Sequence, residues 1–164
     1  MTVPELFQAA FSEEMPNTRR ILERVPEASF SWKPHEKSMT LGRLASHIAE
    51  LPARCASIID TDQFVRQPGT APWAAASTAE LLEKFDATSA EASRALAGLR
   101  EDQLDVIWSM KMGDRTLASL PRGSALRRIF MDHLIHHRAQ LGVYLRLLDV
   151  PIPGMFGPSA DDPR

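Results

Sequence analysis

The stretch "MDHLIHHRAQLGVYLRLL", residues 131–148, carries three of the five histidines of the chain. Its apolar residues recur every three or four positions, which is the spacing of one helix face. His133 and His137 are four residues apart, so a helix places both on that face, one turn above the other. His136 lies about 100° round the helix from His137 and is expected to face elsewhere. The stretch predicts a core helix with two inward-pointing imidazoles.

Two capping boxes mark further helix starts. Thr2 and Ser77 each stand three residues before a glutamate, and apolar residues at helical spacing follow both. The pattern predicts one helix over residues 2–25, with a kink or break at Pro16, and another over residues 77–99.

The rest of the chain completes a helical plan. Apolar spacing predicts a helix over residues 40–60, and the helix with the three histidines starts near Leu120 or Pro121 and ends at Leu148. Residues 61–76 are expected to be loop. A small hairpin around Gly113 and Asp114 is possible. We therefore expect an all-α protein, an up-down four-helix bundle with long loops and a possible small hairpin before the last helix, as a single domain over residues 1–164.

Composition excludes several functional classes. The 164 residues carry a net charge of −2, with no concentrated basic block, which argues against nucleic-acid binding. No apolar run reaches the ~20 residues that a membrane span needs. The start of the chain is acidic and unlike a signal peptide. Cys55 is the single cysteine, so no internal disulfide can form, and we expect a cytoplasmic protein.

A third histidine lies on another inward-facing stripe. His47 stands between Leu44 and Leu51 in the helix predicted over residues 40–60. Helical bundles build metal sites from side chains that converge from facing helices. His47, His133 and His137 are therefore candidate ligands of one metal ion, although inward histidines can also be hydrogen-bonded core residues.

The ligand chemistry limits the metal and the reaction. Three imidazoles suit zinc, nickel, iron or copper better than magnesium or calcium, which prefer oxygen ligands. Three protein ligands with an open position are typical of a reactive site. Such an ion could activate a water or a thiol. Leu134 follows His133, where a zinc protease helix would carry its catalytic glutamate, so a peptidase is not expected.

Other residues near the three histidines have open interpretations. Some polar side chains could orient the imidazoles by hydrogen bonding or could simply be exposed to solvent. Acidic residues of the tail could fold over the site or belong to a frayed terminus. Pro52 could open a cleft beside the metal or simply bend its helix. Cys55 is expected to be a buried, inert thiol. The orienting candidates are Glu50, Asp132 and Gln140, and the tail candidates are Asp161 and Asp162.

Two longer stretches carry a family resemblance. "WKPHEKSMTLGRLASHIAELP", residues 32–52, and "MDHLIHHRAQLGVYLRLLDVPIPGMFGPSADD", residues 131–162, resemble the DinB-like family, with similar spacing between them. The resemblance implies a four-helix bundle with a divalent metal held by three histidines, which map onto His47, His133 and His137. This chain has Ala139 where many relatives have glycine, and Pro16 is atypical.

The resemblance also implies a range of functions. It favours one divalent transition metal, zinc or nickel first and iron as a further candidate. It also favours a homodimer, and binding to nucleic acid or to membranes is not expected. Related branches are transferases or isomerases that use small cytosolic thiols. We expect a metal-dependent transferase or hydrolase acting on a small molecule, possibly with a low-molecular-weight thiol. A non-catalytic metal- or ligand-binding stress-response protein is the alternative, and a purely structural bundle is a third possibility. The sequence does not assign catalytic residues.

Overall fold

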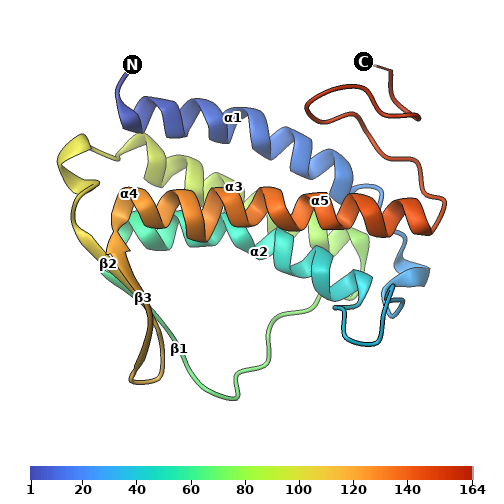
Figure 1. Ribbon diagram of the computed structural model, residues 1–164, viewed down its shortest axis with the longest axis horizontal. Coiled ribbons are helices and arrows are strands. Elements are labelled where there is room, and N and C mark those ends of the chain that lie inside the picture. Colours follow the sequence, from blue (N-terminus) through green and yellow to red (C-terminus); the bar gives the residue numbers. More distant parts are fainter. Residues whose placement is uncertain (164) are drawn as a thin grey trace.

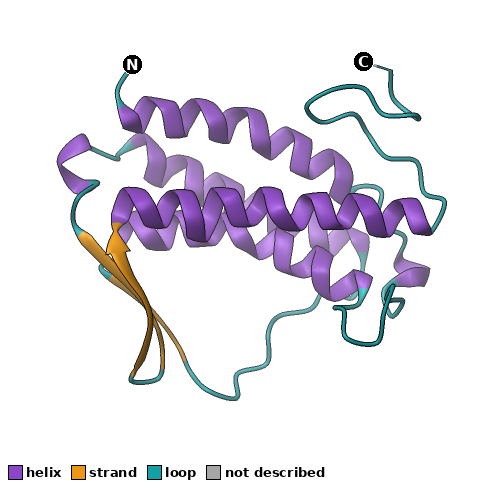
Figure 2. Ribbon diagram, in the orientation of Figure 1, coloured by secondary structure: helices purple, strands orange, loops and turns teal. Residues whose placement is uncertain are grey.

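Four long helical stretches and a small sheet make up the protein (Figure 1, Figure 2). The computed structural model describes residues 1–163. The first three long helices are α1 (Val3–Leu22), α2 (Leu41–Asp60) and α3 (Thr78–Ala97). The fourth stretch is composite and consists of α4 (Arg122–Ala125), a π-helical segment η3 (Leu126–Met131) and α5 (Asp132–Leu147). Two short 3-10 turns, η1 (Glu27–Ser29) and η2 (Glu101–Gln103), lie in the connections.

The predicted helix starts are confirmed, with a complete capping box at Thr2 and a side-chain cap at Ser77. The Thr2 hydroxyl accepts a hydrogen bond from the backbone N–H of Glu5, and the Glu5 carboxylate accepts one from the backbone N–H of Thr2 at 2.7 Å. The Ser77 hydroxyl accepts from the backbone N–H of Glu80 at 3.1 Å. These bonds satisfy donors that the first turn of a helix leaves without partners. α1 continues through Pro16 without a break.

The core lies between the long helices. α2 packs against both α3 and α5, and α1 also packs against α3 and α5. A buried hydroxyl, that of Thr88, donates to the backbone carbonyl of Ala49 at 2.8 Å and ties α3 to α2. Among the fully buried side chains the largest are Trp108, Phe85 and Phe130. This arrangement buries one face of α2 against α5, where the histidine-bearing turns meet.

The prediction of an all-α fold is wrong, because three strands form a mixed sheet. The strands are β1 (Gln63–Arg66), β2 (Ile107–Met112) and β3 (Arg115–Pro121), in the order β1-β2-β3. β2 and β3 form the hairpin that the sequence suggested, and its turn holds Gly113 at a φ of 55°. β1 pairs in parallel with β2, with Gln63 opposite Ser109. The prediction of loop throughout residues 61–76 is therefore also wrong.

The missed strand has a physical explanation. β1 is four residues long, and only Phe64 among them is partly shielded from solvent. So short and exposed a segment shows no clear alternation of apolar and polar residues. Its hydrogen-bonding partner, β2, follows only after the whole of α3. The strand exists because tertiary structure brings β2 alongside it.

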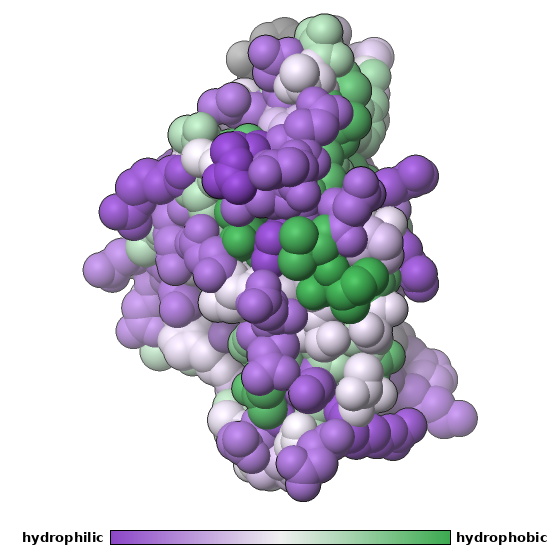
Figure 3. All heavy atoms as spheres, turned by 90° about the vertical axis from the view of Figure 1, so that its left-hand side faces the viewer, coloured by the Kyte–Doolittle hydropathy of each residue, from purple (hydrophilic) through white to green (hydrophobic). Residues whose placement is uncertain are grey.

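The molecular surface is mainly hydrophilic on the side that carries the sheet and the start of α1, with a compact hydrophobic area near its middle and further hydrophobic areas toward its edges (Figure 3). Elements on that side contribute several exposed large apolar residues, which are Val3, Leu6, Val106 and Ile107. Within residues 1–163, every helix is too short or too polar to cross a bilayer.

Candidate metal centre

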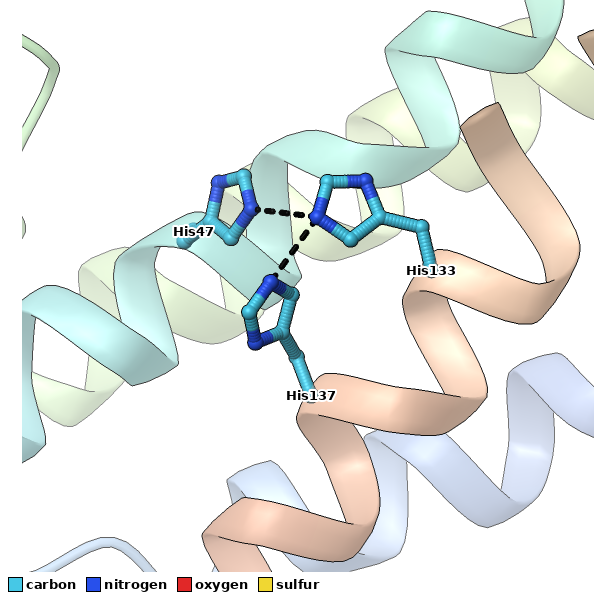
Figure 4. Close-up of side chains that lie close together, drawn as sticks. All are labelled: His47, His133 and His137. Atoms are coloured by element: carbon cyan, nitrogen blue, oxygen red, sulfur yellow. Dashed lines mark hydrogen bonds between the residues drawn. The ribbon is translucent and has the colours of Figure 1, made fainter. Parts of the chain in front are cut away.

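The three predicted histidines meet between α2 and α5. His47 projects from α2, and His133 and His137 project from successive turns of α5, so that the three rings point toward one another (Figure 4). The Nε2 atom of His133 lies 3.2 Å from Nε2 of His47 and 2.8 Å from Nε2 of His137. One nitrogen from each ring falls within a group whose atoms are all within 4.8 Å of one another. We call these three residues the histidine cluster.

A π-helical turn helps to orient His133. The segment η3 directly precedes α5, and the Nδ1 atom of His133 lies 3.4 Å from the backbone carbonyl oxygen of Ile129 within it. A carbonyl oxygen only accepts, so Nδ1 of His133 carries the proton and donates it there. Single π-helical turns in longer helices are frequent at functional sites. The sequence analysis did not identify this carbonyl, because a backbone acceptor leaves no mark in the side-chain pattern.

Gln140 orients the second imidazole of α5. Its side-chain oxygen lies 2.7 Å from Nδ1 of His137 and accepts a hydrogen bond from that nitrogen. Of the three candidates weighed against ordinary solvent exposure, Gln140 is the one that contacts an imidazole of the cluster. Hydrogen bonding at Nδ1 to an acceptor is the usual way in which proteins hold a metal-binding imidazole in one tautomer.

These hydrogen bonds leave lone pairs facing each other. With Nδ1 protonated, Nε2 is a bare acceptor in both His133 and His137, and these two acceptors are 2.8 Å apart. His47 can donate a single proton from Nε2, which cannot satisfy both. Buried polar atoms normally have hydrogen-bond partners, so such a convergence needs an explanation. A cation shared by the three nitrogens fits this donor set.

Electrostatics keep the three imidazoles neutral. Burial, followed by the neighbouring rings of His137 and His133 and then by Arg43 and Arg54, lowers the pKa of His47 to about 3. Burial is also the main cause that lowers the pKa of His133 and His137, against the opposing effect of their hydrogen bonds to Ile129 and Gln140. The neutral imidazole is the form that binds metals, so near pH 7 the cluster is ready to do so.

Other orienting candidates form ion pairs elsewhere. Glu50 lies 3.8 Å from Arg43, and Asp132 lies 3.4 Å from Arg127. The tail does fold back, but onto arginines outside the histidine cluster. There, Asp161 lies 2.5 Å from Arg146, and Asp162 lies 2.5 Å from Arg20.

The remaining singled-out residues have separate environments. Cys55 is fully buried, and burial raises the pKa of its thiol, which confirms the expectation of an inert residue. His136 is exposed, as expected, and so is His35 in its loop. Among the tryptophans, Trp108 is in the core and Trp32 packs edge-on against Tyr144.

A cavity of about 370 Å³ lies next to the histidine cluster, where a cleft beside the metal was one of the two interpretations of Pro52, although Pro52 itself is not among the lining residues. His47 lines the cavity together with Arg43, Glu50 and Arg54, which share one face of α2. Their spacing of i, i+4, i+7 and i+11 is that of a polar stripe, and this signal was available in the sequence. Trp73, from the segment between β1 and α3, forms part of the opposite wall.

Solved structures of two bacterial proteins share the fold. A DinB-like protein from Bacillus cereus ATCC 10987 has a TM-score of 0.71 and 21% sequence identity, over 92% of this chain and 95% of that one. A DinB-like protein from Bacillus subtilis has a TM-score of 0.66 and 22% identity, over 88% of this chain and 92% of that one. At these identities the likeness concerns the fold alone. No protein with a curated description matches the chain.

The sequence also matches a family model along almost its whole length. The model is that of the DinB family, and the match covers residues 1–163. It includes both stretches that carry the resemblance and all three members of the histidine cluster. The chain therefore belongs to the DinB family.

Proposed function

We propose that the histidine cluster binds one divalent transition metal ion, with zinc or nickel favoured and iron as a further candidate. The observation that carries the proposal is the convergence of the three Nε2 atoms, because those of His133 and His137 are 2.8 Å apart and that of His47 lies 3.2 Å from that of His133. Imidazole nitrogens suit these borderline ions. The hydrogen bonds that the Nδ1 atoms of His133 and His137 donate to Ile129 and Gln140 support the same assignment.

We further propose that the protein is a metal-dependent transferase or hydrolase that acts on a small molecule. Three protein ligands are typical of catalytic sites, which keep a position open. An ion in such a site supplies Lewis-acid chemistry, which lowers the pKa of a water or thiol ligand. The cavity that His47 lines provides room for a substrate. A low-molecular-weight thiol as cosubstrate, a homodimer and a cytoplasmic location belong to the same proposal.

One observation favours a non-catalytic metal- or ligand-binding role instead. Within residues 1–163, the group of potential ligand atoms at this site contains three imidazoles but no carboxylate and no thiol. General acid–base catalysis commonly uses a side chain that is not itself a metal ligand, and the carboxylate in the adjacent cavity, that of Glu50, is paired with Arg43. A binding protein has no need of such a catalytic side chain.

Metal content tests the first proposal. The untagged protein, stripped of metal and dialysed against zinc or nickel, is expected to hold one ion per chain by elemental analysis. His47→Ala should lower the affinity at least about a hundredfold, because it removes a direct ligand, whereas changes to residues that only orient a ligand cost about 10–100-fold. His35→Ala is the matched control, since that histidine is exposed in a loop. Equal zinc affinity of His47→Ala and the unmodified protein would refute the ligand assignment.

Turnover separates an enzyme from a binding protein. The zinc-loaded protein should catalyse the reaction of an electrophile with at least one of a panel of cellular thiols, or the hydrolysis of at least one of a panel of esters and amides. His133→Ala should abolish this activity. Metal binding with no turnover in either panel would favour the non-catalytic role. Sedimentation equilibrium of the untagged protein tests the homodimer.

A further inference from the structure

The cavity beside His47 has a strongly positive lining. It lies between α2, the start of α3 and the segment that joins β1 to α3, which loops along the lower edge of the molecule in Figure 1. Its lining includes four cationic side chains but a single carboxylate, that of Glu50. The cations are Arg43, Arg54, Arg66 and Lys84.

Arg54 is the most unusual of these cations. Its guanidinium group lies 3.6 Å from the ring centroid of Phe64, and burial lowers its pKa. The Nη1 atom is buried and has no hydrogen-bond partner within residues 1–163, and no carboxylate among them forms an ion pair with Arg54. A buried charge is costly unless it is paired. Arg54 is half-buried and has no ion-pair partner within residues 1–163, so an anion in the cavity would supply the contact that its Nη1 atom lacks.

Glu50 balances this charge only in part, because its negative charge raises the pKa of Arg54 while its ion pair is made with another arginine. Its carboxylate lies 3.8 Å from Nη1 of Arg43. Arg66 donates to the backbone oxygen of Thr70 at 3.0 Å, so that contact neutralises no charge. The cavity keeps an excess of positive charge on walls that include two aromatic rings, those of Phe64 and Trp73.

The wall opposite α2 is held in place by two hydrogen bonds. The buried Ser46 hydroxyl accepts from the backbone N–H of Ala75 at 3.0 Å, and Nη1 of Arg43 donates to the backbone oxygen of Trp73 at 3.3 Å. Both bonds tie the segment before α3 to α2. The cavity is thus a built feature of the fold, and a preformed pocket of this size is suited to a small ligand.

We propose that this cavity binds a small organic anion, whose carboxylate or phosphate group is held by Arg54 and Arg43 while the rest of the molecule reaches toward His47. Guanidinium groups recognise both kinds of oxyanion through charge-assisted hydrogen bonds. The aromatic side chains favour an apolar body on the ligand. The part of the proposal in which the ligand meets a metal ion rests on the proposed function, whereas the preference for anions does not.

Binding to the metal-free protein tests this selectivity without interference from zinc. Phenylphosphate and phenylacetate are titrated into chelator-stripped protein by calorimetry, alongside neutral phenylacetamide. We expect at least one of the two anions to bind about tenfold or more tighter than the amide, as hydrogen bonds to a charged group allow. Whichever of the two anions binds more tightly identifies the preferred oxyanion.

Variants locate the binding to the cavity. Arg54→Met keeps an apolar stem against Phe64 but removes the charge. It should weaken the binding of the preferred anion about tenfold or more. Arg43→Gln should weaken it as well, and provides a second measurement if Arg54→Met folds poorly. Arg100→Met is the matched control, because Arg100 is exposed and pairs with Asp102.

The outcomes distinguish the two proposals. Anion preference that disappears in Arg54→Met or Arg43→Gln supports the cavity assignment, whatever the zinc content. Equal binding of the amide and both anions, absence of anion binding, or anion binding unchanged in both cavity variants would overturn it even if zinc binds with the expected stoichiometry. Anion binding without zinc binding would overturn the metal proposal alone.

Discussion

Two polar clusters meet the same helix, α5, and differ in how their groups are matched. His137 belongs to the histidine cluster, and the next residue, Arg138, belongs to what we call the arginine cluster, which also contains Glu14 and Thr18 of α1. Nη1 of Arg138 lies 2.5 Å from the Glu14 carboxylate and donates to the Thr18 hydroxyl at 3.1 Å. Opposite charges pair in the arginine cluster, whereas the histidine cluster brings together three groups of the same kind.

This contrast separates a structural polar cluster from a ligand site. The Arg138 and Glu14 side chains are 3% and 9% exposed, and their opposite charges form an ion pair. The imidazoles are only partly buried, and two of them present lone pairs to each other. We therefore expect the arginine cluster to govern folding and the histidine cluster to govern binding. Three experiments test that division.

The largest effect is expected at Glu14. Glu14→Gln leaves the charge of Arg138 buried without its partner, and loss of one member of a buried pair costs about 3–5 kcal/mol. Urea unfolding of the metal-free protein measures this loss. Glu13→Gln is the matched control on the same helix, where the side chain is exposed and the expected change is within about 0.5 kcal/mol. A loss from Glu14→Gln as small as that of the control would show that the arginine cluster does not stabilise the fold.

A smaller effect, on binding, is expected at Gln140. Gln140→Leu removes the acceptor of Nδ1–H of His137 and should weaken zinc binding about 10–100-fold. Competition with a chromophoric chelator measures the affinity, and Gln8→Leu on the exposed side of α1 is the control. We expect only a small change in the unfolding free energy of the metal-free protein. If stability falls while zinc affinity stays the same, Gln140 is a packing residue.

The third effect is expected from pH on the metal-free protein. The pKa of His47 is about 3 in the folded protein and 6.5 when unperturbed, and those of His133 and His137 are also lowered. As pH falls below 6.5, the unfolded chain therefore takes up protons that the folded protein does not, and the unfolding free energy decreases. Above this range the three groups contribute no pH dependence. Urea unfolding between pH 7 and pH 5 measures the slope.

A variant assigns this slope to the histidine cluster. His47→Leu should reduce the pH dependence over the same interval, whereas His35→Asn should leave it unchanged. Equal slopes for the unmodified protein and His47→Leu would mean that other groups control acid stability.

Much of the histidine cluster was predictable, because helical spacing is a local property. The distance of four residues between His133 and His137 places them on one face in any α-helix, and the apolar neighbours of His47 indicate an inward stripe. Gln140 was identified in the same way, three residues after His137. The contact between α2 and α5 depends on packing and needed either the structure or the family resemblance.

The chain's sequence by itself determined where the long helices begin and which of their faces turn inward, because capping groups and apolar periodicity act within a few residues. Tertiary structure alone decided that Gln63–Arg66 would be a strand and that Nη1 of Arg54 would be buried without a hydrogen-bond partner within residues 1–163. Each of these depends on backbone pairing or burial between segments distant along the chain, and local spacing carries no information about such contacts.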